Sequence, residues 1–545
     1  MAAQVGQKTI AIIVPAAVRV SANGRALASV RLGRPDNTLG VLASLVNSAL
    51  PDAHIETICL RKNEPCLTRH MKAVPYGNMD LEIDYVGAQI DHFATQLSEA
   101  DIVLVSCNFT QEAGACAEAI ADIKRINPSV LVLVGGSDPT FRPAYYIDSD
   151  ADIVVRGEAE RLLPAILRRL LDSRDFSDLP NLAWRTQGGA LAMSRMMHHE
   201  DRHLWLPSMS AVTYLVRNDV TVGWELHEGA PPPGVSERSI YFETSRGCVP
   251  GSCGFCTCPP KTGGPDGYRT AELEAMEDVL RSAAGHGVTT LQIIDDNFLA
   301  RAQSEAGEAE LYGLLDAFRR HGFAWEYGNG LQLSRLLSKG EPDHHLLAAM
   351  FSPSAGPDGR VIGGYRAFLP LETATRRRRP DGYGEWAKME GVDLQTTVAL
   401  IEAMDRAGVP MLSLGVMIGF PGDTHEDIDD TVKGMETVEQ CLRGINRRRR
   451  RSGIPELLTH WDVAVYMLLP GTADFRRYRN RTLFHDDYYS HPELVNFHTA
   501  AYWPDHFSPW ELTELRSQIA DHFRGRELTN ASDAHAGHEY VCVGV

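Results

Sequence analysis

The sequence has no long apolar run and no surplus of basic residues. Its 545 residues carry 53 Lys and Arg against 71 Asp and Glu, which gives a formal net charge of −18. A general nucleic-acid-binding surface needs cations to neutralise phosphates, so this balance argues against that class of protein. No stretch approaches the roughly 20 consecutive apolar residues that cross a bilayer, so we expect no membrane partner. The apolar fraction of 44% is that of an ordinary globular chain.

Cysteine is also scarce, and its placement is uneven. Ten cysteines in 545 residues are too few for a disulfide scaffold. The apolar stretch Thr9–Val20 is broken by Pro15 and Arg19, which favours a buried strand over an export signal. Without an export signal we expect a cytoplasmic protein, and in a reducing compartment clustered cysteines are more often metal ligands than disulfides.

Strand-like apolar runs alternate with helical patterns from Lys8 to about Leu171. Such alternation, with β-branched strands, predicts a Rossmann-like parallel sheet covered by helices on both faces. Ligands of these sheets bind at the carboxyl ends of the strands. We therefore expect the loops after Val14, Ser106 and Val134 to form a ligand-binding edge.

A second alternating region begins near residue 238. Six strand–helix units follow up to about residue 475, and they predict a partial (β/α)6 barrel with its active site at the carboxyl ends of the strands. The intervening stretch is irregular and rich in proline, and the last 70 or so residues follow no pattern. The expected α/β organisation is thus a first domain over 1–172, a linker over 173–237, a barrel over 238–475 and a C-terminal extension over 476–545.

Four cysteines crowd a glycine- and proline-rich loop directly after the first barrel strand: Cys248, Cys253, Cys256 and Cys258. A disulfide knot, a zinc site and an iron–sulfur cluster are the three alternatives. Structural zinc sites usually draw on two separated pairs of ligands, and no second pair exists here. Three thiolates from one loop leave one iron of a cubane cluster open to a small molecule, so this loop favours an iron–sulfur cluster.

This loop resembles that of the radical S-adenosylmethionine (radical SAM) superfamily, including the aromatic Phe255 before the last cysteine of the motif. The resemblance continues through the barrel, in motifs that are short one by one but occur in the family's order. They are "IIDDNF" (Ile293–Phe298), "LPLET" (Leu369–Thr373), "GVMIGFPGDT" (Gly415–Thr424) and "LLPGT" (Leu468–Thr472). The resemblance implies that Asp295, Asn297 and Glu372 bind S-adenosylmethionine (SAM) next to a 4Fe-4S cluster.

The cysteine spacing departs from the family pattern by one residue. The usual motif is C-x3-C-x2-C, whereas Cys248, Cys253 and Cys256 give C-x4-C-x2-C. Because loops absorb an inserted residue at little cost, the resemblance still implies these three as cluster ligands. Cys258 is the alternative ligand.

The first domain resembles the cobalamin-binding domain that precedes the barrel in one branch of the superfamily. The run Ile123–Glu160, with "VGGS" and "GEAE", carries this resemblance. It implies that loop residues surround a corrin ring: Asn108, Thr110, Gly135 and Gly136. For Gly135 and Gly136 a plain tight turn is the alternative. The motif D-x-H-x-x-G, which supplies a histidine below cobalt, does not occur in the chain, so we expect no histidine ligand there.

Together these resemblances imply a cobalamin-dependent radical SAM methyltransferase (class B). Its expected cofactors are the 4Fe-4S cluster, SAM and methylcobalamin, and its expected partner is an electron donor such as flavodoxin or ferredoxin. Among such enzymes, the phosphinate P-methylating enzymes of phosphinothricin-type antibiotic pathways fit best in length and substrate charge. The alternatives are sp3-carbon methylation of another antibiotic intermediate and a cobalamin-dependent radical rearrangement without methyl transfer. A non-catalytic sensor is disfavoured, because it would not need the barrel.

Two basic runs stand out in this acidic chain, Arg376–Arg379 and Arg447–Arg451. Each is either a solvated surface segment or an anion site, because guanidinium groups bind oxyanions in bidentate fashion. Arg376 follows the "LPLETAT" strand end, so we expect it to bind an anionic substrate. We expect the second run to lie in a long surface loop.

Overall fold

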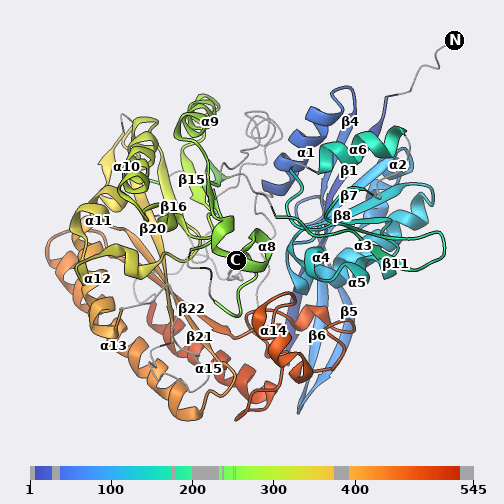
Figure 1. The fold of residues 1–545 in the computed structure, drawn as a ribbon. Helices are drawn as coiled ribbons and strands as arrows, with labels where there is room; N and C mark the ends of the chain where they lie inside the picture. Colours follow the sequence, from blue (N-terminus) through green and yellow to red (C-terminus); the bar gives the residue numbers. More distant parts are fainter. Residues whose placement is uncertain are drawn as a thin grey trace.

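The chain forms two α/β halves, shown side by side in Figure 1, and a C-terminal region that contacts both. The computed structural model describes residues 7–27, 37–160, 162–172, 178–198, 232, 234–235, 238–249, 251, 253–356, 358–373 and 392–527. Within these ranges no helix combines the length and the apolar character that a bilayer crossing would need.

The first half contains a seven-stranded sheet in the order β11-β10-β9-β8-β7-β1-β4. Its five parallel strands are β1 (Thr9–Val14), β4 (His54–Cys59), β7 (Ile102–Ser106), β8 (Leu131–Gly135) and β9 (Ile153–Val155). Their order is that of a doubly wound sheet whose strand order reverses between β1 and β7, and such a reversal is where ligands bind. The predicted Rossmann-like sheet is confirmed.

Two antiparallel strands, β10 (Leu182–Arg185) and β11 (Leu191–Met193), extend this sheet beyond residue 172. Part of the stretch expected to be a linker therefore belongs to the first half. A separate antiparallel sheet, which the sequence did not predict, has the order β3-β2-β6-β5. Its strands are β2 (Ala17–Ala22), β3 (Arg25–Ala26), β5 (Leu67–Tyr76) and β6 (Met79–Gly87).

Helices cover both faces of the first sheet because its strands are apolar on both sides. Ile10 and Ile12 of β1 join the core beneath α1 (Asn37–Ala49) and α6 (Leu163–Asp172). The alternate residues Ala11 and Ile13 join the core on the other face. The helices on that face are α2 (Ala94–Ser98), α3 (Ala113–Ile126), α4 (Ser137–Phe141) and α5 (Pro143–Asp148).

The second half is a barrel of six strands in the order β12-β15-β16-β20-β21-β22, each parallel to its neighbours. The strands are β12 (Ser239–Phe242), β15 (Thr290–Ile293), β16 (Ala324–Tyr327), β20 (Val361–Glu372), β21 (Met411–Ile418) and β22 (Leu458–Val465). In the part of the chain described, β12 and β22 are the ends of this order and do not pair, so the barrel is open. The predicted partial (β/α)6 barrel is confirmed.

Five helices of the described chain surround the barrel, and capping residues mark where some of them begin and end. They are α9 (Leu273–Gly285), α10 (Glu305–Arg320), α11 (His344–Phe351), α12 (Leu394–Ala407) and α13 (His425–Arg451). Thr424, the last residue of "GVMIGFPGDT", caps α13 in a capping box with Asp427, and Gly408 ends α12 in the left-handed conformation. Short elements complete the half: α8 (Cys258–Thr262), β13 (Ser245–Arg246), β14 (Arg269–Thr270), β17 (Leu337–Ser338), β18 (Glu341–Pro342) and β19 (Ser354–Ala355).

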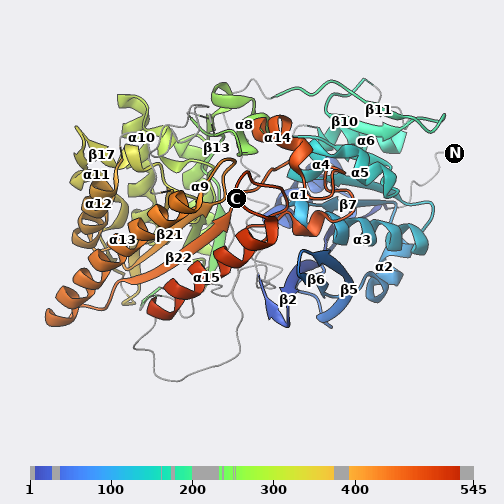
Figure 2. The same cartoon turned by 90° about the horizontal axis from the view of Figure 1, so that it is seen from below.

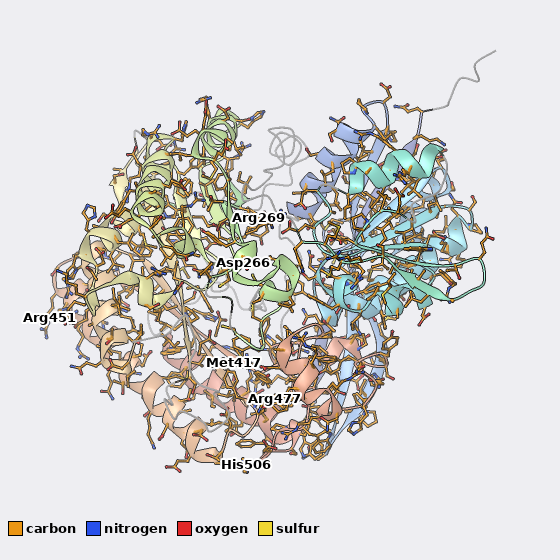
Figure 3. The ribbon with its side chains drawn as sticks, viewed as in Figure 1. Asp266, Arg269, Met417, Arg451, Arg477 and His506 are labelled. Carbon is orange, nitrogen blue, oxygen red and sulfur yellow. The ribbon has the colours of Figure 1, made fainter. Side chains whose placement is uncertain are left out.

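The expected surface loop at Arg447–Arg451 is wrong, because these residues form the last turns of the 27-residue helix α13. Cations are favourable there, since a helix carries partial negative charge at its carboxyl end. Arg451 lies at the outer margin of the barrel in Figure 3. The second basic run therefore takes no part in the site described below.

The C-terminal region returns from the barrel to the first half. After α14 (Ala473–Tyr478), the chain packs against the small antiparallel sheet, where Tyr76 donates to the carbonyl of Ala500 at 2.9 Å and Tyr85 donates to Glu493 at 2.8 Å. Helix α15 (Pro509–Glu527) then lies along β22 (Figure 2). This region thus joins the two halves through buried hydrogen bonds.

Candidate functional site

A cavity of about 680 Å³ lies where the carboxyl ends of the two parallel sheets face each other. Its wall comes from the strand ends and loops of the first sheet, helix α1, the cysteine loop, the inner face of the barrel, and the segments Met467–Pro470 and Val495–His498. Both strand-end regions that the sequence singled out therefore open into one space.

A buried hydrogen-bond network fixes the first-sheet side of this cavity. Asp138 accepts from Thr110 at 2.6 Å and from Tyr146 at 2.6 Å, and Arg142 pairs with it at 2.8 Å. Burial raises the pKa of Tyr146, so its hydroxyl remains a donor. Thr110 lines the cavity and donates its hydroxyl to Asp138, which ties down the loop that also carries Asn108. The contact of Thr110 with a cofactor stays a prediction.

Gly135 and Gly136 both line the cavity, and their surroundings differ. Gly136 has φ +123°, and a Cβ there would lie 2.1 Å from the carbonyl oxygen of Cys107. A Cβ at Gly135 would meet nothing closer than 3.7 Å. Gly136 is therefore required by the turn itself, whereas Gly135 leaves the backbone open to a ligand. The expected absence of a histidine below cobalt stays a prediction; in the described chain the histidine lining the cavity is His498, from the C-terminal region.

All four clustered cysteines line the cavity. The amide of Cys258 donates to the Cys256 sulfur at 3.4 Å, and Asn297 Nδ2 lies 3.5 Å from the Cys248 sulfur. Donors to sulfur favour the thiolate, the form that binds metal. The donor set therefore fits an iron–sulfur cluster held from one side, with the cavity on the other.

Cys258 differs from the other three in its surroundings. It is the first residue of α8 and is buried against the turn that ends at Thr262. Burial raises the pKa of its thiol well above the usual range, which favours the protonated form. Among the described residues, no three His, Cys, Asp or Glu side chains converge on a single metal ion. The assignment of the three ligands stays a prediction.

The "IIDDNF" motif places its three polar residues in different directions. Asp295 is buried and accepts from the amide of Thr244 at 2.6 Å and from the hydroxyl of Ser245 at 2.6 Å, so it ties β15 to the start of the cysteine loop. Asn297 lies behind the loop and bonds the carbonyl of Val249 at 3.0 Å. Ile294 and Asp296 of this motif line the cavity, and Asp296 also accepts from the amide of Gly247 in the cysteine loop at 2.9 Å. The sequence reasoning missed Asp296.

Glu372 ends β20 and lines the cavity. Its backbone has φ +56°, in the left-handed region, after a register shift in the strand. A non-glycine residue held there points its side chain in a direction that a regular strand would not allow. Arg376, the predicted substrate-binding residue, lies outside the described residues, so its role stays a prediction.

Inside the barrel, four adjacent strands place polar side chains in one row. Tyr241 pairs in register with Gln292, Gln292 with Glu326, and Glu326 with Arg366. All four line the cavity. We call this row the polar belt. Arg366 donates to Glu326 at 3.0 Å and to the hydroxyl of Ser413 at 2.9 Å.

Charged side chains also join the two halves beside the cavity. Arg269, labelled in Figure 3, pairs with Glu158 of the first half at 2.8 Å. Arg246 of the cysteine loop pairs with Glu243 at 2.9 Å and with Glu160 of the first half. These pairs are nearly buried and hold the cysteine loop against the first sheet.

Comparisons with known proteins agree with this architecture. Residues 72–167 match the family model of the B12 binding domain. The radical S-adenosylmethionine methyltransferase TsrM from Kitasatospora setae, solved with cobalamin and a 4Fe-4S cluster, is 16% identical; the match covers 86% of this chain and 74% of that one, with a TM-score of 0.53. The cobalamin-dependent S-adenosylmethionine radical enzyme OxsB, solved with aqua-cobalamin, is 13% identical; the match covers 95% of this chain and 68% of that one, with a TM-score of 0.62. No sequence match to a curated protein was found. At these identities the likeness establishes the fold, which is that of cobalamin-dependent radical SAM enzymes.

Proposed function

We propose that this protein is a cobalamin-dependent radical SAM methyltransferase that acts on a small natural-product intermediate. One observation carries the proposal: the cysteine loop and the ligand-binding edge of the first sheet line the same cavity. A radical source and a methyl donor held across one space can both reach a substrate between them.

The cavity provides residues for each cofactor. Cys248, Cys253 and Cys256 would hold the cluster, Glu372 at the barrel rim would contact SAM, and Asn108 with Gly135 would approach the corrin. When bound, these cofactors supply a carbon-centred radical and a transferable methyl group. The chain orients them: Asp138 and Asp295 fix the two loops that would carry them, and the ion pairs between the halves help to keep water out.

For the substrate, we propose a phosphinate of the N-acetyl-demethylphosphinothricin type, methylated at phosphorus. The support is the family resemblance, since the enzymes that methylate such phosphinates fit this chain best in length and in expected substrate charge. Methylation of an sp3 carbon in another antibiotic intermediate is the alternative. We also propose that an electron donor such as flavodoxin or ferredoxin reduces the cluster.

The test is anaerobic turnover of reconstituted protein with SAM carrying a labelled methyl group. We expect 5′-deoxyadenosine together with a labelled product. The alternative is a cobalamin-dependent radical rearrangement without methyl transfer. It predicts 5′-deoxyadenosine and an unlabelled product. Protein that holds a cluster and SAM but never forms 5′-deoxyadenosine would refute both.

A further inference from the structure

The polar belt is unusual for the interior of a parallel barrel. Such interiors are normally filled by layers of branched apolar side chains. Here Tyr241, Gln292, Glu326 and Arg366 occupy one register row on four adjacent strands, and each lines the cavity. Four neighbouring strands thus present hydrogen-bonding groups to the same space.

The ion pair in the belt is more than a device for stability. Arg366 is 3% exposed and Glu326 is 6% exposed. A buried ion pair is weak evidence for stability, because removing two charges from water costs more than their attraction usually returns. This pair also lines the cavity, where a ligand can meet it. Arg366 is held at Nε by Ser413 and at Nη1 by Glu326, which fixes the plane of its guanidinium group.

Charge and geometry define the ligand. A guanidinium group binds oxyacids through parallel N–H bonds, and a carboxylate accepts from N–H donors. The pair has no net charge, so a bare anion would be attracted by Arg366 and repelled by Glu326. A ligand with an oxyacid group beside an N–H group satisfies both residues. Glu326 lies three residues before Asn329 at the rim of β16, about 10 Å along the strand, which suits the length of a small molecule.

We propose that the polar belt binds the head group of an amino acid or N-acyl amino acid substrate, with its oxyacid on Arg366 and its N–H on Glu326. This inference rests on the proposed function, since it names the substrate class of the same cavity. The head group then lies deep in the barrel, and the atom to be modified lies nearer the cofactors.

The test uses the full-length protein and a defined set of probes: the twenty amino acids, their N-acetyl derivatives, and the methyl esters of both sets. Binding is measured by calorimetry. We expect at least one free acid to bind ten-fold or more tightly than its ester. In the double variant Glu326→Gln/Arg366→Gln, which keeps hydrogen-bonding groups in place, we expect that preference to fall below about two-fold.

The matched control is Asp405→Asn/Arg449→Gln, a second buried ion pair at 2.6 Å that joins α12 and α13 outside the cavity. It should keep the wild-type preference. The proposal is overturned if no free acid is preferred over its ester, or if the belt variant keeps the preference. SAM cleavage without substrate separates the two hypotheses: if the wild type still forms 5′-deoxyadenosine, failure of the belt leaves the proposed function standing.

Discussion

The two parallel sheets of this protein use their faces differently. In the first sheet, alternate residues of β1 enter two separate apolar cores, and the cavity reaches this sheet at its strand ends and beside α1. In the barrel, the strands are apolar toward the outer helices and polar toward the interior at the belt. The first sheet thus meets the cavity at one end, whereas the barrel meets it at its rim and along the inner face of four strands. The difference indicates why one half would carry a cofactor alone and the other a cofactor and a substrate.

The two ligand-binding edges nevertheless share a device, a buried aspartate that ties neighbouring loops together. Asp138 does this with a cation, Arg142, while Asp295 does it with hydroxyl and amide donors from Thr244 and Ser245. Burial raises the pKa of Asp295, and its hydrogen bonds oppose that rise. Substitutions in the loops of each half test whether the two edges are built as described.

The largest effect is expected in the cysteine loop, which has no counterpart in the first half. Cys248→Ala, Cys253→Ala or Cys256→Ala should each abolish the cluster, measured as iron and sulfide after anaerobic reconstitution, where the wild type should hold about four of each. Cys258→Ala should keep most of the iron because the family resemblance assigns the three ligands to the other cysteines, and burial raises the pKa of the Cys258 thiol. Loss of the cluster in Cys258→Ala, with retention in one of the other three, would overturn the ligand assignment.

The next effect separates two adjacent glycines of the first sheet. Gly136→Ala forces a Cβ to 2.1 Å from a backbone oxygen, so it should lower the free energy of unfolding by roughly 2–4 kcal/mol and abolish cobalamin binding. Gly135→Ala should leave thermal stability near the wild-type value, because its Cβ meets nothing closer than 3.7 Å. Equal destabilisation by both changes would show that the turn is not as described.

A smaller loss of stability is expected from changes at Asp295, which ties the end of β15 to the cysteine loop. Asp295→Ala leaves the donors of Thr244 and Ser245 without their acceptor, so it should cost about 3 kcal/mol of stability and lower the iron content of the reconstituted protein. The neighbouring change Asp296→Asn keeps an oxygen that can accept from the amide of Gly247, so it should cost under about 1 kcal/mol. Urea unfolding of the two variants compares them, and equal losses would contradict the different roles assigned to the two aspartates.

The smallest effect concerns pH and the C-terminal segment. Burial lowers the pKa of His498, which is 6% exposed, well below its usual value. Below about pH 6.5 the unfolded chain binds a proton that the folded protein does not, so stability should fall with falling pH by up to about 1.4 kcal/mol per unit. His498→Gln should reduce this slope, measured as urea midpoints at pH 7.5, 6.5 and 5.5. Burial also lowers the pKa values of His321 and His491. Both residues are present in the wild type and in the variant, so their contributions cancel when the two slopes are compared. An unchanged slope would mean that His498 is accessible to protons.

Much of the fold could be predicted because most parallel strands are short apolar runs, and most helices show a helical spacing of apolar residues and a residue that ends them. The small antiparallel sheet was missed since half-exposed strands such as β5 mix polar and apolar residues. The clustered cysteines were found from sequence, but the polar belt was not. Gln292 and Arg366 share a row only because β15 and β20 both pair with β16, and the sequence does not show that register. Asp295 and Asp296 follow the end of β15, so their different directions depend on contacts with the cysteine loop that no strand period predicts. The segment at His498 carries no periodic signal, and its place depends on long-range contacts.

The return of the chain from the barrel to the first half has a consequence for protein engineering and for the way such enzymes diversify. Lys72 and Tyr85 of the first half both contact Glu493, some 400 positions later in the chain, and Tyr76 contacts Ala500. The first half is therefore discontinuous along the chain, with its last piece encoded after the barrel. A chimera that exchanges only the residues before β12 would leave Glu493 facing a foreign surface. An exchange that carries residues 479–502 along would keep these three contacts within the transplanted part.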